Sequence, residues 1–406
     1  MPRTRIRIPV HSPLIPLIAL TALSLTACSA ATAGGPAASG QSAGAAAGDG
    51  KSARGPAAQV TVAPPKAGLP VTVTATGGTL ARVKVVDADG VELVGRTGAD
   101  GAAWTSERKA GPGSSYTVEV TSRGTGGTES TARSSVSVPA AELVNKLTLA
   151  PGKNTTVGVA QPLSIVFDRP VTNKADVERQ LKVTTSNGTE GAWGWVTDYS
   201  GRDRADWRPK DYWKPGTKVT LDATLDGTDS GARGGWFVRD YRTGFTVDSD
   251  SRVVKVDLDR KRLEVVRNGR VVTTIPVSGG TPGGDKRSWR GTAVLMAKEG
   301  TIRMNSETVG LGDAYNKMVD SSMRLTWSGM YAHAAPWNAA WFGKANKSSG
   351  CIGMSKAEAA ALFDALRPGD PFEIKGADTK GVVAEGNGYG DWNVSWTEWK
   401  KKSALA

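Results

Sequence analysis

The chain has 406 residues, only two cysteines and two histidines, and a formal net charge of +12. The basic residues are scattered and accompany no DNA- or RNA-binding motif, so we expect no nucleic-acid partner. The positive excess instead favours association with anionic polymers or lipid headgroups.

The N-terminal 27 residues have the layout of a secretory signal, because three arginines precede an apolar run that is too short to span a membrane permanently. Their last residues and the next, Leu-Thr-Ala-Cys28, resemble the lipobox of bacterial lipoproteins, in which the cysteine becomes the acylated first residue of the mature chain. We therefore expect lipidation at Cys28, anchoring on the outer face of the cell membrane, and a flexible Ala/Gly/Ser linker over residues 28–58. A conventional signal with an unmodified Cys28 is the alternative.

Short alternating strands separated by Gly, Pro, Asp and Asn occupy the next two regions. Val71 and Val73, for example, are separated by one polar residue, which is the period of a half-buried strand. The spacing of strands and turns predicts two immunoglobulin-like β-sandwiches without cysteines, at residues 59–142 and 143–249. Neither region contains an acid/base constellation, so we interpret both as spacers or binding modules.

A different pattern begins at residue 250 and continues to residue 376. Two β-branched runs flank Asn268-Gly269, which predicts a β-hairpin with a tight turn. The glycine-rich stretch 279–284 is interpreted as a long flexible loop and not as a phosphate cradle, because no Lys-Ser/Thr pair opens a helix behind it.

The end of this region combines a short helix with a closing strand. Ser355 and Glu358 form a capping box, which predicts a helix that ends near Leu366. Residues 372–374 are expected to close the sheet. A Trp-rich extension follows at residues 377–406, and we expect its tryptophans to pack across a domain junction.

Cys351 and His333 are the only cysteine and histidine available to form a pair beside a glycine turn. A free cysteine near pKa 8.5 is mostly protonated at neutral pH, so a nucleophilic thiol needs an imidazole to take its proton. The glycine before Cys351 permits a tight turn that can direct the amides of Gly350 and Cys351 at a tetrahedral oxyanion. A buried, inert Cys351 is the alternative.

The segments Ser328–Trp337 and Ser348–Ser355 resemble the catalytic signature of the L,D-transpeptidases of bacterial cell walls. The resemblance extends over the mature chain, including the two immunoglobulin-like regions and the Trp-rich tail, and is similar to the long, lipid-anchored actinobacterial members. It implies a β-rich catalytic domain at residues 250–376 and a cysteine acyltransferase. The implied substrate is the tetrapeptide stem of peptidoglycan, which loses D-Ala and forms a 3→3 cross-link.

The resemblance also assigns roles to further residues. The backbone carbonyl of Ala334 is expected to orient the ring of His333, with Cys351 as the nucleophile and Gly350 as an oxyanion donor. Residues 304–315 are expected to form a mobile lid over the substrate. The expected substrate-binding residues are Tyr315, Ser328, Gly329, Tyr331, Trp337, Ser349 and Gly353. Ser328 and Gly329 are expected to act through backbone hydrogen bonds to an extended peptide. For Tyr331 and Trp337, simple packing on the sheet is an equally good interpretation.

Two positions depart from the family pattern. Ser349 stands where a histidine is usual, and Gly353 stands where an Asn or Arg is common, so substrate affinity is in question. An acidic loop that binds calcium in some relatives keeps only Asp229 here and gains Arg233, so we expect no metal, and no cofactor.

The alternatives to a transpeptidase are a cysteine hydrolase on the same wall peptides and a catalytically silent wall-binding lipoprotein. Carbapenems are expected to acylate Cys351, and the protein is expected to be a monomer.

Overall fold

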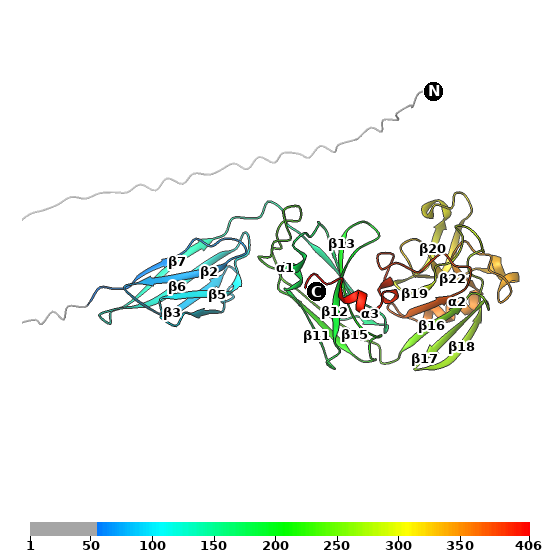
Figure 1. Cartoon of the computed structure of the whole chain (residues 1–406), viewed down its shortest axis with the longest axis horizontal. Coiled ribbons are helices and arrows are strands. Elements are labelled where there is room, and N and C mark those ends of the chain that lie inside the picture. The colour runs from blue at the N-terminus through cyan, green and yellow to red at the C-terminus, as the bar shows by residue number, and fades with distance from the viewer. Residues whose placement is uncertain (1–54) are drawn as a thin grey trace, which may run out of the picture. The chain divides into compact units, whose positions relative to one another are not determined.

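The computed structural model describes residues 55–406, and Figure 1 shows their strands and helices. The protein is mainly β, as predicted, with two immunoglobulin-like sandwiches followed by a β-rich catalytic domain. The predicted signal, Cys28 and most of the linker lie outside the described residues. Within residues 55–406, no helix has the length and apolar character needed to cross a membrane.

The first sandwich consists of a four-stranded and a three-stranded sheet, with strand orders β1-β2-β5-β4 and β3-β6-β7. Alternate residues of each strand point inward, so Val71 and Val73 of β2 and Val118 and Val120 of β6 form its core with Trp104. Its strands are β1 (Gln59–Val62), β2 (Pro70–Thr76), β3 (Gly78–Asp87), β4 (Gly95–Thr97), β5 (Ala103–Lys109), β6 (Ser115–Gly124) and β7 (Glu129–Ser137).

The second sandwich pairs two four-stranded sheets, β12-β13-β10-β8 and β11-β14-β15-β9. Aromatic side chains from both sheets fill the space between them, including Phe167, Trp195 and Phe245. Its elements are β8 (Leu147–Ala150), β9 (Thr156–Val157), β10 (Leu163–Phe167), α1 (Lys174–Glu178), β11 (Leu181–Thr185), β12 (Gly191–Thr197), β13 (Asp203–Pro209), β14 (Lys218–Ala223) and β15 (Tyr241–Val247).

The catalytic domain contains a five-stranded sheet, β18-β17-β16-β24-β19, and a four-stranded sheet, β20-β21-β22-β23. One core joins the two sheets and α2, which packs on β21 and β22. The elements are β16 (Arg252–Asp257), β17 (Arg262–Arg267), β18 (Arg270–Pro276), β19 (Gly291–Val294), β20 (Ala297–Asn305), η1 (Ser306–Val309), β21 (Asn316–Arg324), β22 (Tyr331–Ala334), η2 (Pro336–Trp341), β23 (Ile352–Met354), α2 (Lys356–Ala365) and β24 (Pro371–Lys375).

Local sequence signals account for several of these boundaries. Asn268 and Gly269 both have positive φ, 49° and 79°, as a tight turn between β17 and β18 requires, so the predicted hairpin is confirmed. The predicted capping box is also confirmed, because the Ser355 hydroxyl accepts from the N–H of Glu358 and the Glu358 carboxylate accepts from the N–H of Ser355. The cap starts α2 directly behind β23.

The prediction of a flexible loop at residues 279–284 was wrong for its first three residues. The N–H of Gly280 donates to the Ser288 hydroxyl over 2.9 Å, and the N–H of Ser348 donates to the carbonyl of Gly279 over 2.9 Å. The N–H of Thr281 in turn donates to the carbonyl of Ser348. A Cβ on Gly280 would lie 2.1 Å from a backbone oxygen. Glycine at position 280 therefore allows another backbone segment to approach closely. Through its bonds to Ser348, the loop supports the segment that carries Cys351.

The C-terminal extension contains η3 (Gly390–Asn393), which packs on β19, and α3 (Trp396–Lys400), which packs on β12 of the second sandwich. The guanidinium of Arg208, on β13, lies 4.9 Å from the ring of Trp392, 5.5 Å from that of Trp396 and 4.8 Å from that of Trp399. Trp399 is fully buried, and its Nε1–H donates to the carbonyl of Ala192 over 3.0 Å. The three tryptophans thus enclose one arginine of the second sandwich.

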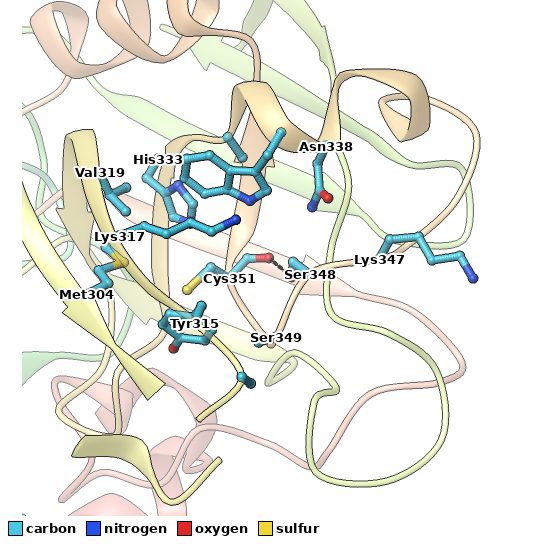
Figure 2. Close-up of a pocket in the computed structure, with 13 residues that line it drawn as sticks. Met304, Tyr315, Lys317, Val319, His333, Asn338, Lys347, Ser348, Ser349 and Cys351 are labelled. Carbon is cyan, nitrogen blue, oxygen red and sulfur yellow. Dashed lines mark hydrogen bonds between the residues drawn. The ribbon is translucent and has the colours of Figure 1, made fainter. Parts of the chain in front are cut away.

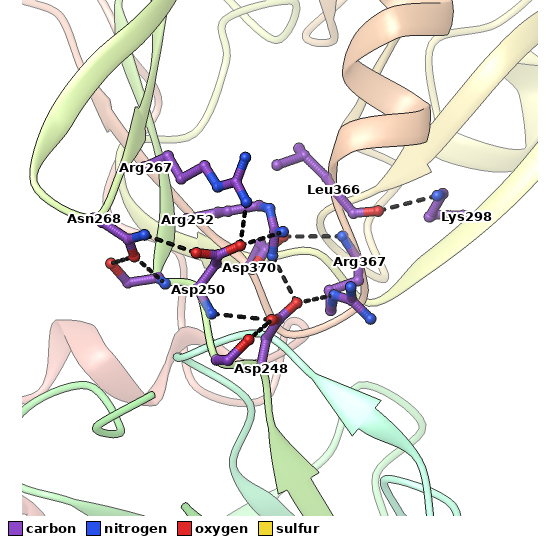
Figure 3. A network of polar contacts seen from close by, with 11 residues as sticks. Asp248, Asp250, Arg252, Arg267, Asn268, Lys298, Leu366, Arg367 and Asp370 are labelled. Atoms are coloured by element: carbon purple, nitrogen blue, oxygen red, sulfur yellow. Dashed lines mark hydrogen bonds and ion pairs between the residues drawn. The ribbon is translucent and has the colours of Figure 1, made fainter. Parts of the chain in front are cut away.

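A second polar contact joins the sandwich to the catalytic domain, as Figure 3 shows. Asp248 follows β15 and accepts hydrogen bonds from Arg252 at 2.7 Å; it also pairs with Arg367. Asp370 is fully buried beside them and accepts from the N–H of Arg367 over 2.9 Å. Burial raises the pKa of Asp370 to about 7, although the N–H of Arg367 and the two guanidinium groups act in the opposite direction.

Candidate active site

The two strands β22 and β23 place the histidine and the cysteine on one face of the small sheet. They pair in parallel, with His333 opposite Gly353. Cys351 lies two residues before Gly353, and residues two apart in an extended chain share a face. The side chains of His333 and Cys351 consequently line the same cavity of about 190 Å³, which Figure 2 shows.

His333 is buried and neutral. Its Nδ1 lies 2.7 Å from the carbonyl oxygen of Ala334. A carbonyl only accepts, so this contact assigns the hydrogen to Nδ1 and leaves a lone pair on Nε2. Burial lowers the pKa of His333, and the bond to Ala334 offsets this in part. An imidazole in this state can accept a proton.

The Cys351 thiol is also buried and uncharged. Burial raises its pKa to about 11, although an N–H from Tyr331 that points at the sulfur acts in the opposite direction. The thiol donates to the carbonyl of Gly329, with 3.7 Å between Sγ and O. The resting cavity is therefore lined by a neutral thiol and a neutral imidazole, so deprotonation has to accompany attack on a substrate.

The turn before Cys351 differs from the prediction for Gly350. Its φ of +118° requires glycine, as the tight turn implied. Its N–H, however, donates to the Ser348 hydroxyl over 3.1 Å, and that hydroxyl donates to the carbonyl of Cys351 over 2.5 Å. The Gly350 amide is thus occupied. The N–H of Cys351 makes no hydrogen bond within residues 55–406 and is the donor that remains free to meet an oxyanion.

Three of the predicted substrate residues line the cavity: Tyr315, Trp337 and Ser349. Burial raises the pKa of Tyr315 to about 12, and Cys351 contributes to the shift, so this phenol stays neutral. The indole of Trp337 is 44% exposed and its ring centre lies 6.0 Å from that of His333. The other lining residues are Met304, Ala314, Lys317, Val319, His333, Ala335, Asn338, Lys347, Ser348 and Cys351.

Gly329 and Tyr331 lie on the other side of the thiol, along a neighbouring cavity of about 560 Å³. Gly329 has a φ of +90°, and a Cβ there would lie 2.5 Å from the side chain of Val309. The Tyr331 hydroxyl donates to Glu299 over 3.1 Å. Both residues contact the Cys351 sulfur through their backbones, Gly329 with its carbonyl and Tyr331 with its N–H.

Two predicted substrate residues lie outside the first cavity. The Ser328 hydroxyl accepts from Trp289 Nε1 at 3.2 Å and from Asn387 Nδ2 at 2.8 Å, so it fixes a loop to the C-terminal extension. Gly353 is buried on β23, where a Cβ would lie 2.8 Å from the Cβ of Ala335. The Ser328 N–H also donates to Asn387 Oδ1 over 2.8 Å, and the role of these two residues in substrate binding stays a prediction.

Lys317 is the residue that sequence reasoning missed. It lies on β21, which begins directly after Tyr315. Tyr315, Lys317 and Val319 all line the cavity because alternate residues of an extended chain share a face. Lysines on strands usually face solvent, so nothing in the sequence indicated that Lys317 lines the cavity.

Residues 55–406 contain no group of three His, Cys, Asp or Glu side chains arranged as metal ligands.

Comparison with known proteins agrees with this architecture. Residues 61–229 match the model of a bacterial Ig domain, and residues 251–374 match that of the L,D-transpeptidase catalytic domain. L,D-transpeptidase 2 of Mycobacterium tuberculosis is 33% identical over 83% of this chain and 81% of its own length. L,D-transpeptidase 5 of the same species is 30% identical over 83% of this chain and 73% of its own length.

A solved structure, that of LD transpeptidase LdtMt1 in complex with imipenem, covers 57% of this chain and all of its own, with 32% identity and a TM-score of 0.48. The sequence matches define an enzyme with an L,D-transpeptidase catalytic domain and an Ig-like N-terminal part, and one cavity of that domain is lined by both Cys351 and His333. The chain belongs to the L,D-transpeptidase family.

Proposed function

We propose that this L,D-transpeptidase forms 3→3 cross-links in peptidoglycan through a thioester on Cys351. The observation that carries the proposal is the β22/β23 register, because it brings one thiol and one neutral imidazole into one cavity. Its acyl donor is a tetrapeptide stem, and its acceptor is the side-chain amine of a second stem.

In the first half-reaction, Cys351 Sγ attacks the carbonyl carbon of the diamino acid at position three while Nε2 of His333 takes the thiol proton. The tetrahedral intermediate carries its negative charge on oxygen, and the free N–H of Cys351 is the donor that stabilises it. The C–N bond then breaks, and the departing amine of D-Ala takes the proton back from His333. A thioester on Cys351 remains.

In the second half-reaction, the amine of another stem attacks the thioester carbonyl and passes a proton to His333. The C–S bond breaks, the sulfur recovers that proton, and a new amide joins the two stems. Because both thiol and imidazole begin and end neutral, the cycle needs no preformed ion pair, in agreement with the shifts of both pKa values. Ala334 acts as a positioning residue through its carbonyl.

The same thiol accounts for the proposed inhibition by carbapenems. A strained β-lactam carbonyl takes the place of the stem amide, and ring opening leaves the whole inhibitor attached as a thioester. No leaving group departs, so the adduct adds the full mass of the inhibitor.

We also propose that the enzyme works from a lipid anchor at Cys28 on the outer face of the membrane. The Leu-Thr-Ala-Cys28 motif supports this, together with the apolar run that precedes it. Expression of the full chain in a bacterial host, followed by detergent partitioning, tests it. The native chain should enter the detergent phase and Cys28→Ala should not; equal partitioning would contradict the anchor.

Incubation of the full chain with a disaccharide tetrapeptide tests the proposed reaction. We expect a dimer that has lost one D-Ala, and no dimer with Cys351→Ala. Free tripeptide as the main product would assign a hydrolase instead. Binding without turnover would leave a silent wall-binding protein.

A further inference from the structure

The cavity beside Cys351 carries positive charge that nothing in the described chain neutralises. Its lining includes Lys317 and Lys347 but no aspartate or glutamate. Neither lysine takes part in an ion pair among residues 55–406, although twenty-three such contacts occur there. The nearby acid Asp320 is already paired with Lys356 at 2.9 Å. The cavity is therefore built to receive an anionic group.

The two lysines differ in where their ammonium groups lie. Figure 2 shows Lys317 extending across the cavity, whereas Lys347 extends away from it. The ammonium of Lys317 lies 4.6 Å from the ring of Trp337, which also neighbours His333. That of Lys347 lies 5.6 Å from the outer indole of Trp341. Contact with an indole face limits the motion of the long Lys317 side chain, so its charge is held beside Trp337 at the cavity.

We infer that Lys317 is a specificity-determining residue that binds the terminal carboxylate of the donor stem. This inference rests on the proposed function. In a peptide cut at its last amide, the terminal carboxylate lies within about 4 Å of the attacked carbonyl carbon, roughly the span of one residue. A group that recognises that carboxylate must therefore share the cavity of the thiol, as Lys317 does.

The chemistry of the leaving group agrees with this assignment. The terminal residue departs with its carboxylate, so the ion pair with Lys317 is made by the donor and is lost when the acyl-enzyme forms. The cavity is then free for the acceptor. Gly353 offers no side chain to the cavity, and within residues 55–406 the remaining polar lining groups are uncharged apart from Lys347.

The test compares two donor peptides, a tetrapeptide stem with a terminal carboxylate and the same stem with a terminal carboxamide. Acylation of the full chain is followed by intact mass and by released D-Ala or D-Ala amide. We expect the wild type to favour the carboxylate at least tenfold in kcat/KM, mainly through KM, because binding is what the ion pair supplies. Lys317→Gln should reduce that preference to threefold or less, and Lys317→Arg should restore part of it.

Lys344→Gln is the matched control, since Lys344 is an exposed lysine between η2 and β23 that does not line the cavity. It should keep the wild-type preference. An unchanged preference in Lys317→Gln would overturn the inference. So would an equal loss for both peptides accompanied by a shifted pH profile, because Lys317 would then act on Cys351 or His333. If neither peptide acylates the wild type, the proposed function falls as well, and that outcome is distinct from equal acylation by both.

Discussion

The cavity beside Cys351 and the junction around Arg204 both contain buried polar groups, yet they are built in opposite ways. Arg204 is buried and lies 2.7 Å from Asp206 and 3.5 Å from Asp391, with the carbonyl of Glu385 at 2.6 Å. Burial, with Asp206 beside it, raises the pKa of Asp391 well above its usual range although Arg204 acts in the opposite direction. At this junction the charged groups face one another, across β13 and the C-terminal extension.

In the cavity, by contrast, polar groups point into open space and lack protein partners among the described residues. Lys317 has no acidic partner among the described residues, the amide of Cys351 has no acceptor, and the indole of Trp337 is nearly half exposed. The comparison indicates that one region stabilises the structure and the other binds a substrate. The junction holds the second sandwich and the C-terminal extension together, and the cavity keeps these polar groups, unpaired within residues 55–406, for a substrate. Substitutions at the junction should therefore lower stability, and substitutions at the cavity should lower activity.

Removing the proposed base should give the largest effect. His333→Gln keeps a polar side chain but cannot take the thiol proton, so we expect acylation of Cys351 to fall by about 10²–10⁴. The thermal midpoint should change little, since the bond to Ala334 is replaceable. Stopped-flow or mass-resolved acylation by a carbapenem measures the rate. A loss of less than tenfold would assign the proton transfer to another group.

Removing the central cation of the junction should instead unfold the protein more easily. Arg204→Met leaves two buried carboxyl groups without their counter-ion, which typically costs about 3–5 kcal/mol. Urea denaturation measures the loss. Arg242→Met is the control, because its pair with Asp222 is exposed and such pairs contribute about 0–1 kcal/mol. Equal losses in both variants would contradict the contrast between the two regions.

A smaller effect is expected behind the cavity, where Gly353 packs on Ala335. Gly353→Ala introduces a Cβ at 2.8 Å from that of Ala335, and overpacking of this kind costs about 1–3 kcal/mol. The double variant with Ala335→Gly should recover most of the stability. If the two substitutions prove additive, the Cβ contact is not the cause.

The smallest effect concerns pH. The folded-state pKa of Asp370, about 7, exceeds the usual 3.8, so the folded state binds this proton more tightly than the unfolded chain does. Its contribution to stability is therefore fully present below about pH 4 and is lost as the pH rises to about 7. Asp370→Asn cannot titrate, and its thermal midpoint should fall less than that of the wild type between pH 4.5 and 8. Parallel curves would exclude a titrating Asp370.

Much of the fold follows from local sequence signals, and these are the parts that were predicted correctly. The Asn268-Gly269 hairpin and the Ser355/Glu358 cap depend on neighbours within four residues, so the structure that they predict does not depend on tertiary context. The alternation of Val71 and Val73 likewise fixes which face of β2 is buried. His333 and Cys351 were found because the chain offers no other such pair.

The parts that were missed depend on contacts between distant segments. Gly279 was interpreted as part of a flexible loop, but Ser348, nearly seventy residues later, holds it in place. The backbone of Ser328 was expected to face a substrate peptide, but its N–H donates to Asn387 of the extension. The amide of Gly350 was assigned to an oxyanion before the Ser348 hydroxyl was known to occupy it. No pattern in the sequence reports these pairings.

The most direct measurement of the central claim is the intact mass of the full chain after incubation with a carbapenem. The account predicts that the wild type gains the mass of one inhibitor molecule and that Cys351→Ala gains nothing. A wild type that stays unmodified, or an adduct that persists in Cys351→Ala, would contradict a nucleophilic Cys351.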